Sequence, residues 1–129
     1  MNHFELHAHM KVRPGKLEGF KAQAAELIRI TREQDTKTLR YDWFLKEDGT
    51  ECEVHELYLT EAGLFEHNQH VMAAREILFR DFAFDHKMAA FGEVSPSWPR
   101  ESPGSSHVKG SAPSDRYAAW PFGSPHRSP

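Results

Sequence analysis

Two histidines and one carboxylate in the middle of the chain have the residue types of a proton-transfer site. His67 and His70 lie three positions apart in a segment of helical character, so their side chains should lie close to one helix face. The imidazole pKa of about 6.5 lets histidine take up and return a proton near neutral pH. Glu56 precedes this helix and could orient a histidine or share a proton with a substrate. We therefore predict His67 as the general base, His70 as the second choice, and Glu56 as their partner.

Three aromatic side chains near these residues are suited to binding a flat substrate. Tyr41 and Trp43 share one face of a predicted strand, and Tyr58 shares a face with Glu56 on the next strand. Their rings could stack on an aromatic ligand and keep water away from the base. Packing inside the core or inside a dimer explains the same three residues equally well.

Each catalytic candidate also has an explanation without chemistry. A solvated start of a helix accounts for His67 and His70, and a cross-strand ion pair with lysine or arginine accounts for Glu56. Cys52 is explained as a small buried apolar residue, because neither a helix N-terminus nor a nearby base marks its thiol as reactive.

The nine histidines of the chain raise the question of a bound metal. His7 and His9 share one face of the first predicted strand. His55 and the pair His67 and His70 could add ligands, and zinc needs three or four that converge on one point. His7 and His9, however, alternate with apolar residues that should face the helices, so they should point away from His67. Since no H-E-x-x-H motif is present either, we predict no bound metal.

The elements that must position these residues follow from hydrophobic periodicity. Residues 4–12 alternate between apolar and polar side chains, as in a half-buried strand. Pro14 and Gly15 end this strand. Residues 16–34 then carry an apolar stripe at helical spacing, which predicts an amphipathic helix.

The next part of the chain is predicted to be a hairpin, a second helix and a last strand. Residues 38–45 and 51–59 read as strands, joined by a turn that contains the Asp-Gly pair typical of tight hairpins. An apolar stripe predicts a helix from residue 60 to about residue 82, and residues 85–94 read as the fourth strand. The order β-α-β-β-α-β predicts an α+β, ferredoxin-like fold, with an antiparallel four-stranded sheet and both helices on one face.

The sheet face without helices also carries large side chains, which should be covered. A domain of about 94 residues buries a modest share of its surface, so dimerisation is a reasonable way to bury more. A second copy of the same sheet is the simplest cover, and we therefore predict a two-fold homodimer.

Composition divides the chain into a domain of residues 1–94 and a C-terminal tail of residues 95–129. Seven of the eight prolines lie at or after Pro96, and Ser, Pro and Gly dominate the tail. Such a segment buries little apolar area to offset the entropy cost of ordering. We expect the tail to be disordered or to dock on the dimer through its aromatic residues, which are Trp98, Tyr117, Trp120 and Phe122.

Charge and hydropathy exclude several classes of partner. The formal net charge is −3, without a basic stripe, which argues against nucleic acid. No apolar run approaches the roughly 20 residues that span a bilayer, and the alternating N-terminus lacks a signal-peptide core. The single cysteine, Cys52, excludes an internal disulfide and fits a reducing compartment, so we predict a cytoplasmic protein.

Several segments, taken in order, resemble the antibiotic biosynthesis monooxygenase domain family, including its quinol monooxygenase-like members. They are KVRPGKLEGF after the first strand, LRYDWFLKEDGTECEVHELY across the hairpin, and TEAGLFEHNQHV at the start of the second helix. FGEV at the end of the fourth strand also fits. The resemblance covers roughly residues 5–94 and leaves out the tail.

The resemblance implies a dimeric α/β barrel with a pocket in each subunit between sheet and helices. Glu56 matches an acidic residue of the family's third strand, and Tyr58 falls where the family often has an aromatic. His67 matches the helix histidine, in the segment AGLFEH, and His70 lies near a second one. The haem-degrading branch has Asn on strand one and Trp at the end of strand three. This chain has Ala8 and Tyr58 there, which argues against haem.

Together these observations predict a cofactor-independent monooxygenase that oxidises a small quinol or anthrone-like aromatic, with molecular oxygen as co-substrate. In such chemistry a base converts the substrate to an anion, which then passes an electron to dioxygen. Two alternatives stay open: an isomerase or lyase that acts by proton transfer on a small metabolite, and a non-catalytic domain that binds a small ligand.

Overall fold

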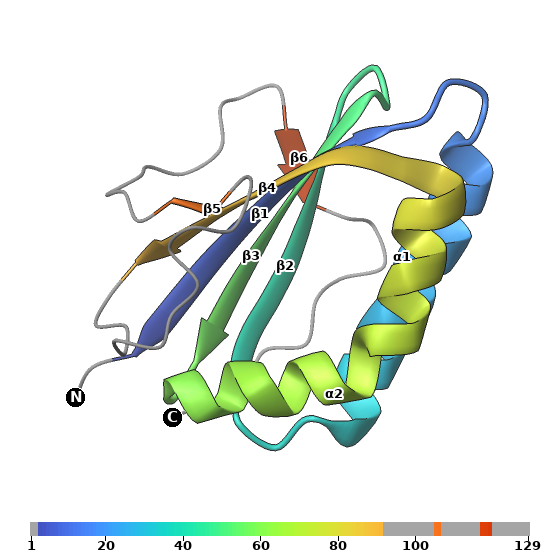
Figure 1. The fold of residues 1–129 in the computed structure, drawn as a ribbon. Coiled ribbons are helices and arrows are strands. Elements are labelled where there is room, and N and C mark those ends of the chain that lie inside the picture. The colour runs from blue at the N-terminus through green and yellow to red at the C-terminus, as the bar shows by residue number, and fades with distance from the viewer. Residues whose placement is uncertain (1–2, 92–104, 107–116, 120–129) are drawn as a thin grey trace.

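The computed structural model describes residues 3–91, 105–106 and 117–119, and it shows a sheet covered on one face by two helices (Figure 1). The elements of the structure in chain order are β1 (Phe4–Val12), α1 (Leu17–Gln34), β2 (Thr38–Lys46), β3 (Glu51–Tyr58), α2 (Glu61–Ile77), the π-helical turn η1 (Leu78–Phe82), β4 (Ala83–Phe91), β5 (Ser105–Ser106) and β6 (Tyr117–Ala119). The predicted β-α-β-β-α-β order is present, so the ferredoxin-like α+β fold is confirmed.

The strands lie in the order β5-β4-β1-β3-β2-β6. The four long central strands are antiparallel to their neighbours. Short β5 pairs in parallel with β4 at one edge, and short β6 pairs antiparallel with β2 at the other. Residues 92–104, 107–116 and 120–129 lie outside the described residues, so the domain boundary at residue 94 and the role of the tail stay predictions.

The core lies between the sheet and the two helices. The apolar side chains of β1 alternate inward as predicted, and the central strands bury Trp43 and Tyr58 completely or nearly so. α1 packs on them with a stripe that includes Phe20, whose ring centroid lies 6.3 Å from that of Trp43. Burying side chains of this size stabilises a fold by about 1.5–3 kcal/mol each, so this layer fixes the helices on the sheet.

β4 contains an extra residue near Asp85 that reverses the facing of its side chains. In its pairing with β1, Lys11 lies opposite Phe84, whereas His9 lies opposite Lys87, and Asp85 has a φ of 54°. One inserted residue shifts the alternation of a strand by one position. The side chain of Ala83, before the bulge, therefore faces the helices, and so does His86 after it.

The second helix and the fourth strand meet at a different residue than predicted. The α-helical part of α2 ends at Ile77, and a π-helical turn continues to Phe82. β4 then begins at Ala83, two residues before the predicted start, because Ala83 is fully buried and pairs with Val12. The π turn and the bulge interrupt the regular periods from which the sequence locates element ends. Residues 92–94, the predicted end of this strand, lie outside the described residues.

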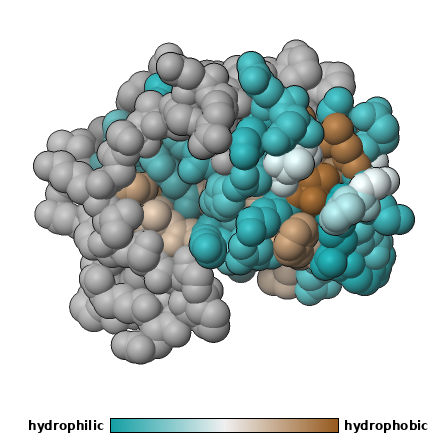
Figure 2. All heavy atoms as spheres, turned by 90° about the horizontal axis from the view of Figure 1, so that it is seen from above, coloured by the Kyte–Doolittle hydropathy of each residue, from teal (hydrophilic) through white to brown (hydrophobic). Residues whose placement is uncertain are grey.

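Seen from above, the described surface is mostly hydrophilic, with a compact hydrophobic area on the helix side (Figure 2). None of the helices in the described part of the chain is long and apolar enough to cross a membrane. Large apolar side chains that are exposed among the described residues are Phe65, Met72, Ile77 and Phe84.

Gly63 lets the first turn of α2 pack directly on the end of the hairpin. A Cβ atom at this position would lie 3.1 Å from Lys37 Cβ, 3.2 Å from the Lys37 carbonyl oxygen and 3.2 Å from Tyr58 Cβ. Backbone and Cβ atoms cannot rotate out of the way. Gly63 therefore sets how closely His67, one turn later, approaches the sheet.

Replacing Gly63 with alanine should lower the free energy of unfolding by about 1–2 kcal/mol, because α2 must move off the sheet. This loss should appear although alanine is the better helix former by about 1 kcal/mol. Urea denaturation measures it, with Ala73→Gly on the exposed side of the same helix as the reference for helix propensity. A Gly63→Ala protein as stable as the wild type would contradict the close packing.

Candidate active site

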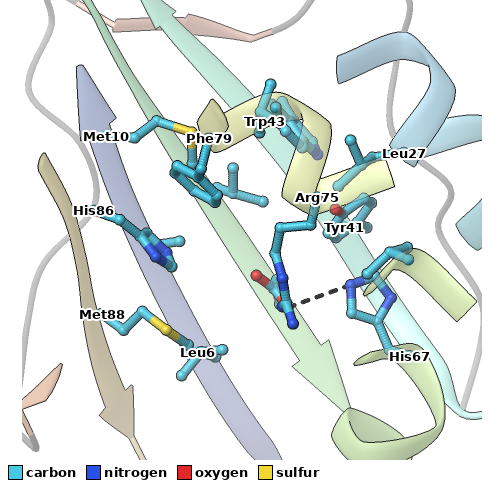
Figure 3. A pocket seen from close by; sticks show the side chains of 15 residues that line it. Leu6, Met10, Leu27, Tyr41, Trp43, His67, Arg75, Phe79, His86 and Met88 are labelled. Carbon is cyan, nitrogen blue, oxygen red and sulfur yellow. Dashed lines mark ion pairs between the residues drawn. The ribbon is translucent and has the colours of Figure 1, made fainter. Parts of the chain in front are cut away.

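A cavity lies between the sheet and the helices, where the central strands face α2 (Figure 3). Its empty space, including the part open to solvent, is about 410 Å³. Only a small part of it is wide enough for water, so a substrate with several rings requires side chains to move. The lining residues are Leu6, Ala8, Met10, Leu27, Tyr41, Trp43, Val54, Glu56, His67, Val71, Arg75, Leu78, Phe79, His86 and Met88.

His67 is held by a buried carboxylate on the side away from the cavity. Its side chain is 2% exposed, and Nδ1 lies 2.7 Å from Asp35 Oδ2 and 3.4 Å from Thr31 Oγ1. Because an ionised carboxylate only accepts hydrogen bonds, we assign the Nδ1 proton as donated to Asp35. Nε2 is then left with a lone pair on the cavity side, as a general base requires.

Glu56 faces His67 across the cavity floor. The dashed line in Figure 3 marks this pair, in which Nε2 of His67 lies 3.8 Å from Oε1 of Glu56. Glu56 is largely buried and accepts a hydrogen bond from the Tyr58 hydroxyl. A distance of 3.8 Å is too long for a direct hydrogen bond but leaves both groups able to contact the same substrate atom.

The two tyrosines next to this pair stay protonated. Burial raises the pKa of the Tyr58 phenol well above its usual value, and the negative charge of Glu56 raises it further. Burial and the negative charge of Glu56 also raise the pKa of the Tyr41 phenol. The Tyr41 ring lies edge-on to the His67 ring, with 4.8 Å between the centroids. Both hydroxyls are therefore neutral hydrogen-bond donors at neutral pH.

Asp35 is placed by the end of α1, where its backbone N–H donates to the Thr31 carbonyl. Its carboxylate accepts hydrogen bonds from His67, from His70 Nδ1 at 2.6 Å and from Thr38 Oγ1 at 2.6 Å. Burial by itself raises the pKa of Asp35, but the bonds from the two histidines and Thr38 outweigh it, so the pKa lies below its usual value. Asp35 is a buried anion that orients His67.

Arg75 and His86 give the other half of the cavity a different character. Arg75 extends from α2 toward the centre of the cavity (Figure 3), and its Nη1 donates to Asn68 Oδ1 at 2.9 Å. Burial lowers the pKa of His86 to about 4, and the charge of Arg75 acts in the same direction. His86 is therefore neutral at neutral pH, and Arg75 offers a positive charge to an anionic substrate oxygen.

The structure brings together four of the six residues predicted for the site. Tyr41, Trp43, Glu56 and His67 all line the cavity. The solvated helix start proposed as an alternative for His67 is wrong, because the side chain is buried. The cross-strand ion pair proposed for Glu56 is replaced by the hydrogen bond from the tyrosine two residues later.

The other two predicted residues lie behind the cavity wall. Tyr58 supports Glu56 from a separate apolar cluster and does not line the cavity. His70 lies on the far side of Asp35 from His67 and is 26% exposed.

Three residues of the site were missed by the sequence reasoning. Asp35 lies in a short polar connection, where most side chains are solvated, so nothing in the sequence marks it. Arg75 follows His67 by eight positions, which is about two helical turns. The spacing 67–71–75 places both side chains on one helix face, so it could have indicated that Arg75 belongs to the site. His86 was hidden by the bulge in β4, which reverses the facing of the side chains.

The histidines considered as a metal set lie on opposite faces of the sheet. His7 stacks on His55 with ring centroids 3.7 Å apart on the face away from the helices, and His9 Nε2 lies 2.9 Å from Glu51 Oε1. His67 lies on the helix face, so these residues do not converge on one point.

Among the described residues, the ligand atoms of Asp35, Glu66 and His70 lie within 4.8 Å of one another. They could contribute oxygen and nitrogen ligands to a divalent cation. Asp35 and His70 already bond to each other, however, and Glu66 accepts hydrogen bonds from the Thr36 backbone N–H and hydroxyl. The cluster is thus satisfied by its own hydrogen bonds.

Comparison with protein families gives one match. The sequence profile of the family described as "Antibiotic biosynthesis monooxygenase" matches residues 4–75, a stretch that contains Asp35, Glu56 and His67. No match was found among curated proteins.

Solved structures with a similar fold share little sequence with this chain. A "Putative antibiotic biosynthesis monooxygenase from Nitrosomonas europaea" is 20% identical, with a TM-score of 0.63, over 73% of this chain and 92% of that chain. A protein from Caulobacter crescentus CB15, described in the same words, is 20% identical with a TM-score of 0.65 over the same shares. MupZ from Pseudomonas fluorescens is 22% identical, with a TM-score of 0.63, over 71% and 73%. At these identities the similarity establishes the fold alone.

Replacing Asp35 with asparagine should lower the free energy of unfolding by about 2–3 kcal/mol at neutral pH, because two histidines lose their anionic partner. The carboxylate has a lowered pKa in the folded state, so its contribution is complete above the unfolded pKa of about 3.9. It is lost as the pH falls through the folded value. The difference in free energy of unfolding between the wild type and Asp35→Asn, measured by urea denaturation, should therefore become smaller below about pH 4.

The matched control is Asp81→Asn, on an exposed carboxylate that pairs with the adjacent Arg80. This change should shift the urea midpoint much less. If both variants lose the same small amount of stability at neutral pH, Asp35 does not carry the buried charge described above.

Proposed function

Because a match over residues 4–75 places this chain in the antibiotic biosynthesis monooxygenase family, we propose that it is a cofactor-independent monooxygenase of a small quinol or anthrone-like aromatic. The observation that carries the proposal is the position of His67. Its Nδ1 is held by the Asp35 carboxylate at 2.7 Å, and its Nε2 faces an apolar cavity that also contains Glu56. An oriented base in a site poor in water is what formation of a substrate anion requires.

The first step is proton removal from the substrate. His67 takes a proton at Nε2 from an acidic C–H or O–H group, and the Asp35 carboxylate stabilises the resulting imidazolium. The substrate anion is held by the positive charge of Arg75 on the cavity wall.

Oxygen then reacts with the anion. The anion transfers one electron to dioxygen, and the two radicals combine into a peroxide on the same carbon. For an anthrone-like CH₂ group, loss of water converts this peroxide to a carbonyl, so one oxygen atom enters the product and the other leaves as water. His67 returns its proton to the departing oxygen, and no external reductant is needed.

Aromatic walls suit this substrate class. Tyr41 and Trp43 meet edge-to-face with centroids 5.8 Å apart, and both line the cavity beside His67. Aromatic rings favour such edge or offset contacts with a further flat ring. Phe79 and Met88 on the opposite wall are partly buried rather than fully enclosed, so they are the side chains best placed to move for a larger ligand.

A second candidate is an isomerase or lyase that acts by proton transfer alone. The observation that favours it is the pairing of His67 and Glu56, two proton carriers that face each other in the cavity with Nε2 and Oε1 3.8 Å apart. One could remove a proton from a substrate carbon and the other could return it to a neighbouring atom, without oxygen.

A non-catalytic binding domain differs from the oxygenase and from the isomerase or lyase, because it releases its bound ligand chemically unchanged.

We also propose that the protein is a homodimer joined through the sheet face opposite the helices. A row of flat rings crosses this face from Phe44 through His55 and His7 to Phe91, with successive centroids 5.0, 3.7 and 4.5 Å apart. Aromatic side chains of this kind are enriched at protein interfaces.

Cys52 is a free and buried thiol, which suits the cytoplasm as the proposed location.

Oxygen uptake by the purified, metal-free protein with a panel of anthrones and reduced quinones tests the proposed reaction. His67→Gln should lower uptake at least tenfold, about 1.4 kcal/mol of transition-state stabilisation, because glutamine cannot act as the base. Gln69→Ala, on the exposed side of the same helix, is the control and should retain the wild-type rate.

The same substrates in anaerobic buffer separate the two reactions. Conversion that continues without oxygen, and that His67→Gln abolishes, would replace the oxygenase with the isomerase or lyase. Uptake that is equal in wild type and His67→Gln would remove His67 from either mechanism.

Sedimentation equilibrium should give the mass of two chains for the full-length protein. Phe44→Arg should shift the mass toward one chain, because it places an unmatched charge in the proposed interface. Phe65→Arg, on the exposed side of α2, is the control and should leave the mass unchanged. A monomeric wild-type protein at tens of micromolar would contradict the dimer.

A further inference from the structure

The Asp35 carboxylate joins two histidines in different surroundings. Its Oδ2 contacts Nδ1 of His67, which is 2% exposed, and its Oδ1 contacts Nδ1 of His70, which is 26% exposed. The two contacts are 2.7 and 2.6 Å. One carboxylate therefore connects the ring at the cavity with a ring that water can reach.

This arrangement creates competition for one negative charge. Asp35 is an anion, so both histidines donate their Nδ1 protons to it. If His70 is already an imidazolium, its positive charge offsets Asp35 and makes a second imidazolium at His67 costly. Two positive rings on a single buried carboxylate would leave these three groups with a net charge of +1, so the two imidazolium ions would repel each other.

We propose that His70 is a positioning residue of the reaction, which releases a proton to solvent when His67 takes one from the substrate, while Asp35 stays ionised between them. This inference rests on the proposed function only in naming His67 as the base. His70 does not contact the cavity and so is not a catalytic residue in the strict sense.

The protons balance without any transfer through the carboxylate. Before turnover His70 carries the positive charge and His67 is neutral. The substrate proton binds to Nε2 of His67, and His70 loses one proton to water from its own Nε2. The Nδ1 protons of both rings remain on their hydrogen bonds to Asp35, and the net charge of the three groups stays at zero. Return of the substrate proton reverses both events.

The other ionisable groups around the pair come from three elements. On the cavity side, Glu56 of β3 and Tyr41 of β2 face His67, and Arg75 of α2 lines the same cavity. The Tyr58 ring of β3 lies behind the cavity wall, 5.7 Å from the His67 ring between centroids. Both tyrosines are neutral, because burial raises the pKa of each phenol, so Glu56 and Arg75 are the charges on that side.

On the solvent side, Glu66 of α2 lies near His70 and Asp35, with ligand atoms within 4.8 Å. Its carboxylate is bonded to Thr36, and its pKa lies below the usual value, because these bonds outweigh the effect of burial. Glu66 is therefore negative throughout the range in which histidine titrates. Its negative charge lies beside His70 and Asp35.

Two substitutions at His70 should move the titration of His67 in opposite directions. His70→Gln keeps a donor for Asp35 but removes the competing charge, so the midpoint of the His67 titration should rise by about one pH unit, tenfold in proton affinity. His70→Lys leaves a permanent positive charge beside Asp35, so the same midpoint should fall by a similar amount. A purely structural role of His70 does not predict shifts of opposite sign.

The experiment is a pH titration of the histidine ring signals by NMR on the full-length protein without substrate. In the wild type, the His67 and His70 signals should follow two shared macroscopic steps, as coupled groups do. His9→Gln, on the other face of the sheet, is the control and should leave the His67 curve unchanged. A His67 curve that is the same in wild type, His70→Gln and His70→Lys would overturn the proposal.

The titration and the oxygen assay can fail separately. Coupled titration in a protein that consumes no oxygen would support the His70 proposal and count against the oxygenase. Oxygen uptake with a pH profile that neither His70 variant shifts would support the oxygenase and overturn the role of His70.

Discussion

A buried carboxylate is the constraint on which the rest of the site depends. An ion taken out of water costs several kcal/mol unless charges and hydrogen bonds compensate it. Asp35, at the end of α1, is compensated by His67 and His70 of α2 and by Thr38 of β2. Satisfying this one charge therefore fixes two helices and a strand relative to one another, and it fixes the base in the same step.

Two local features, one in α2 and one in β4, shape the remaining parts of the cavity. Gly63 allows α2 to approach the hairpin closely enough for His67 to reach Asp35 and Glu56. The bulge at Asp85 turns His86 of β4 inward beside Arg75. The cavity consequently has one half that accepts protons and another that carries a fixed positive charge. A reaction that first forms and then holds an anion needs these two properties next to each other.

The sequence predicted the fold far better than the site, for a physical reason. Periods of two and 3.6 residues report burial along many positions, so patterns such as the alternation of β1 and the stripe of α1 identified the elements and their order. A catalytic contact depends on single residues that the fold brings together. His67 was predicted because its residue type is informative, whereas Asp35 has the appearance of an ordinary loop aspartate. The same periods misplaced the start of β4, because the π turn and the bulge interrupt them.

Family membership and the fold leave the reaction open, since one fold can carry many chemistries. The reaction is constrained by the charges around the cavity. The cavity holds a base, a carboxylate and a guanidinium, and their charges should stay nearly balanced while a proton moves between apolar walls. A histidine that is itself reachable by water, on the other oxygen of the same aspartate, provides that balance without opening the cavity. The position of His70 outside the cavity thus follows from the electrostatics of the base.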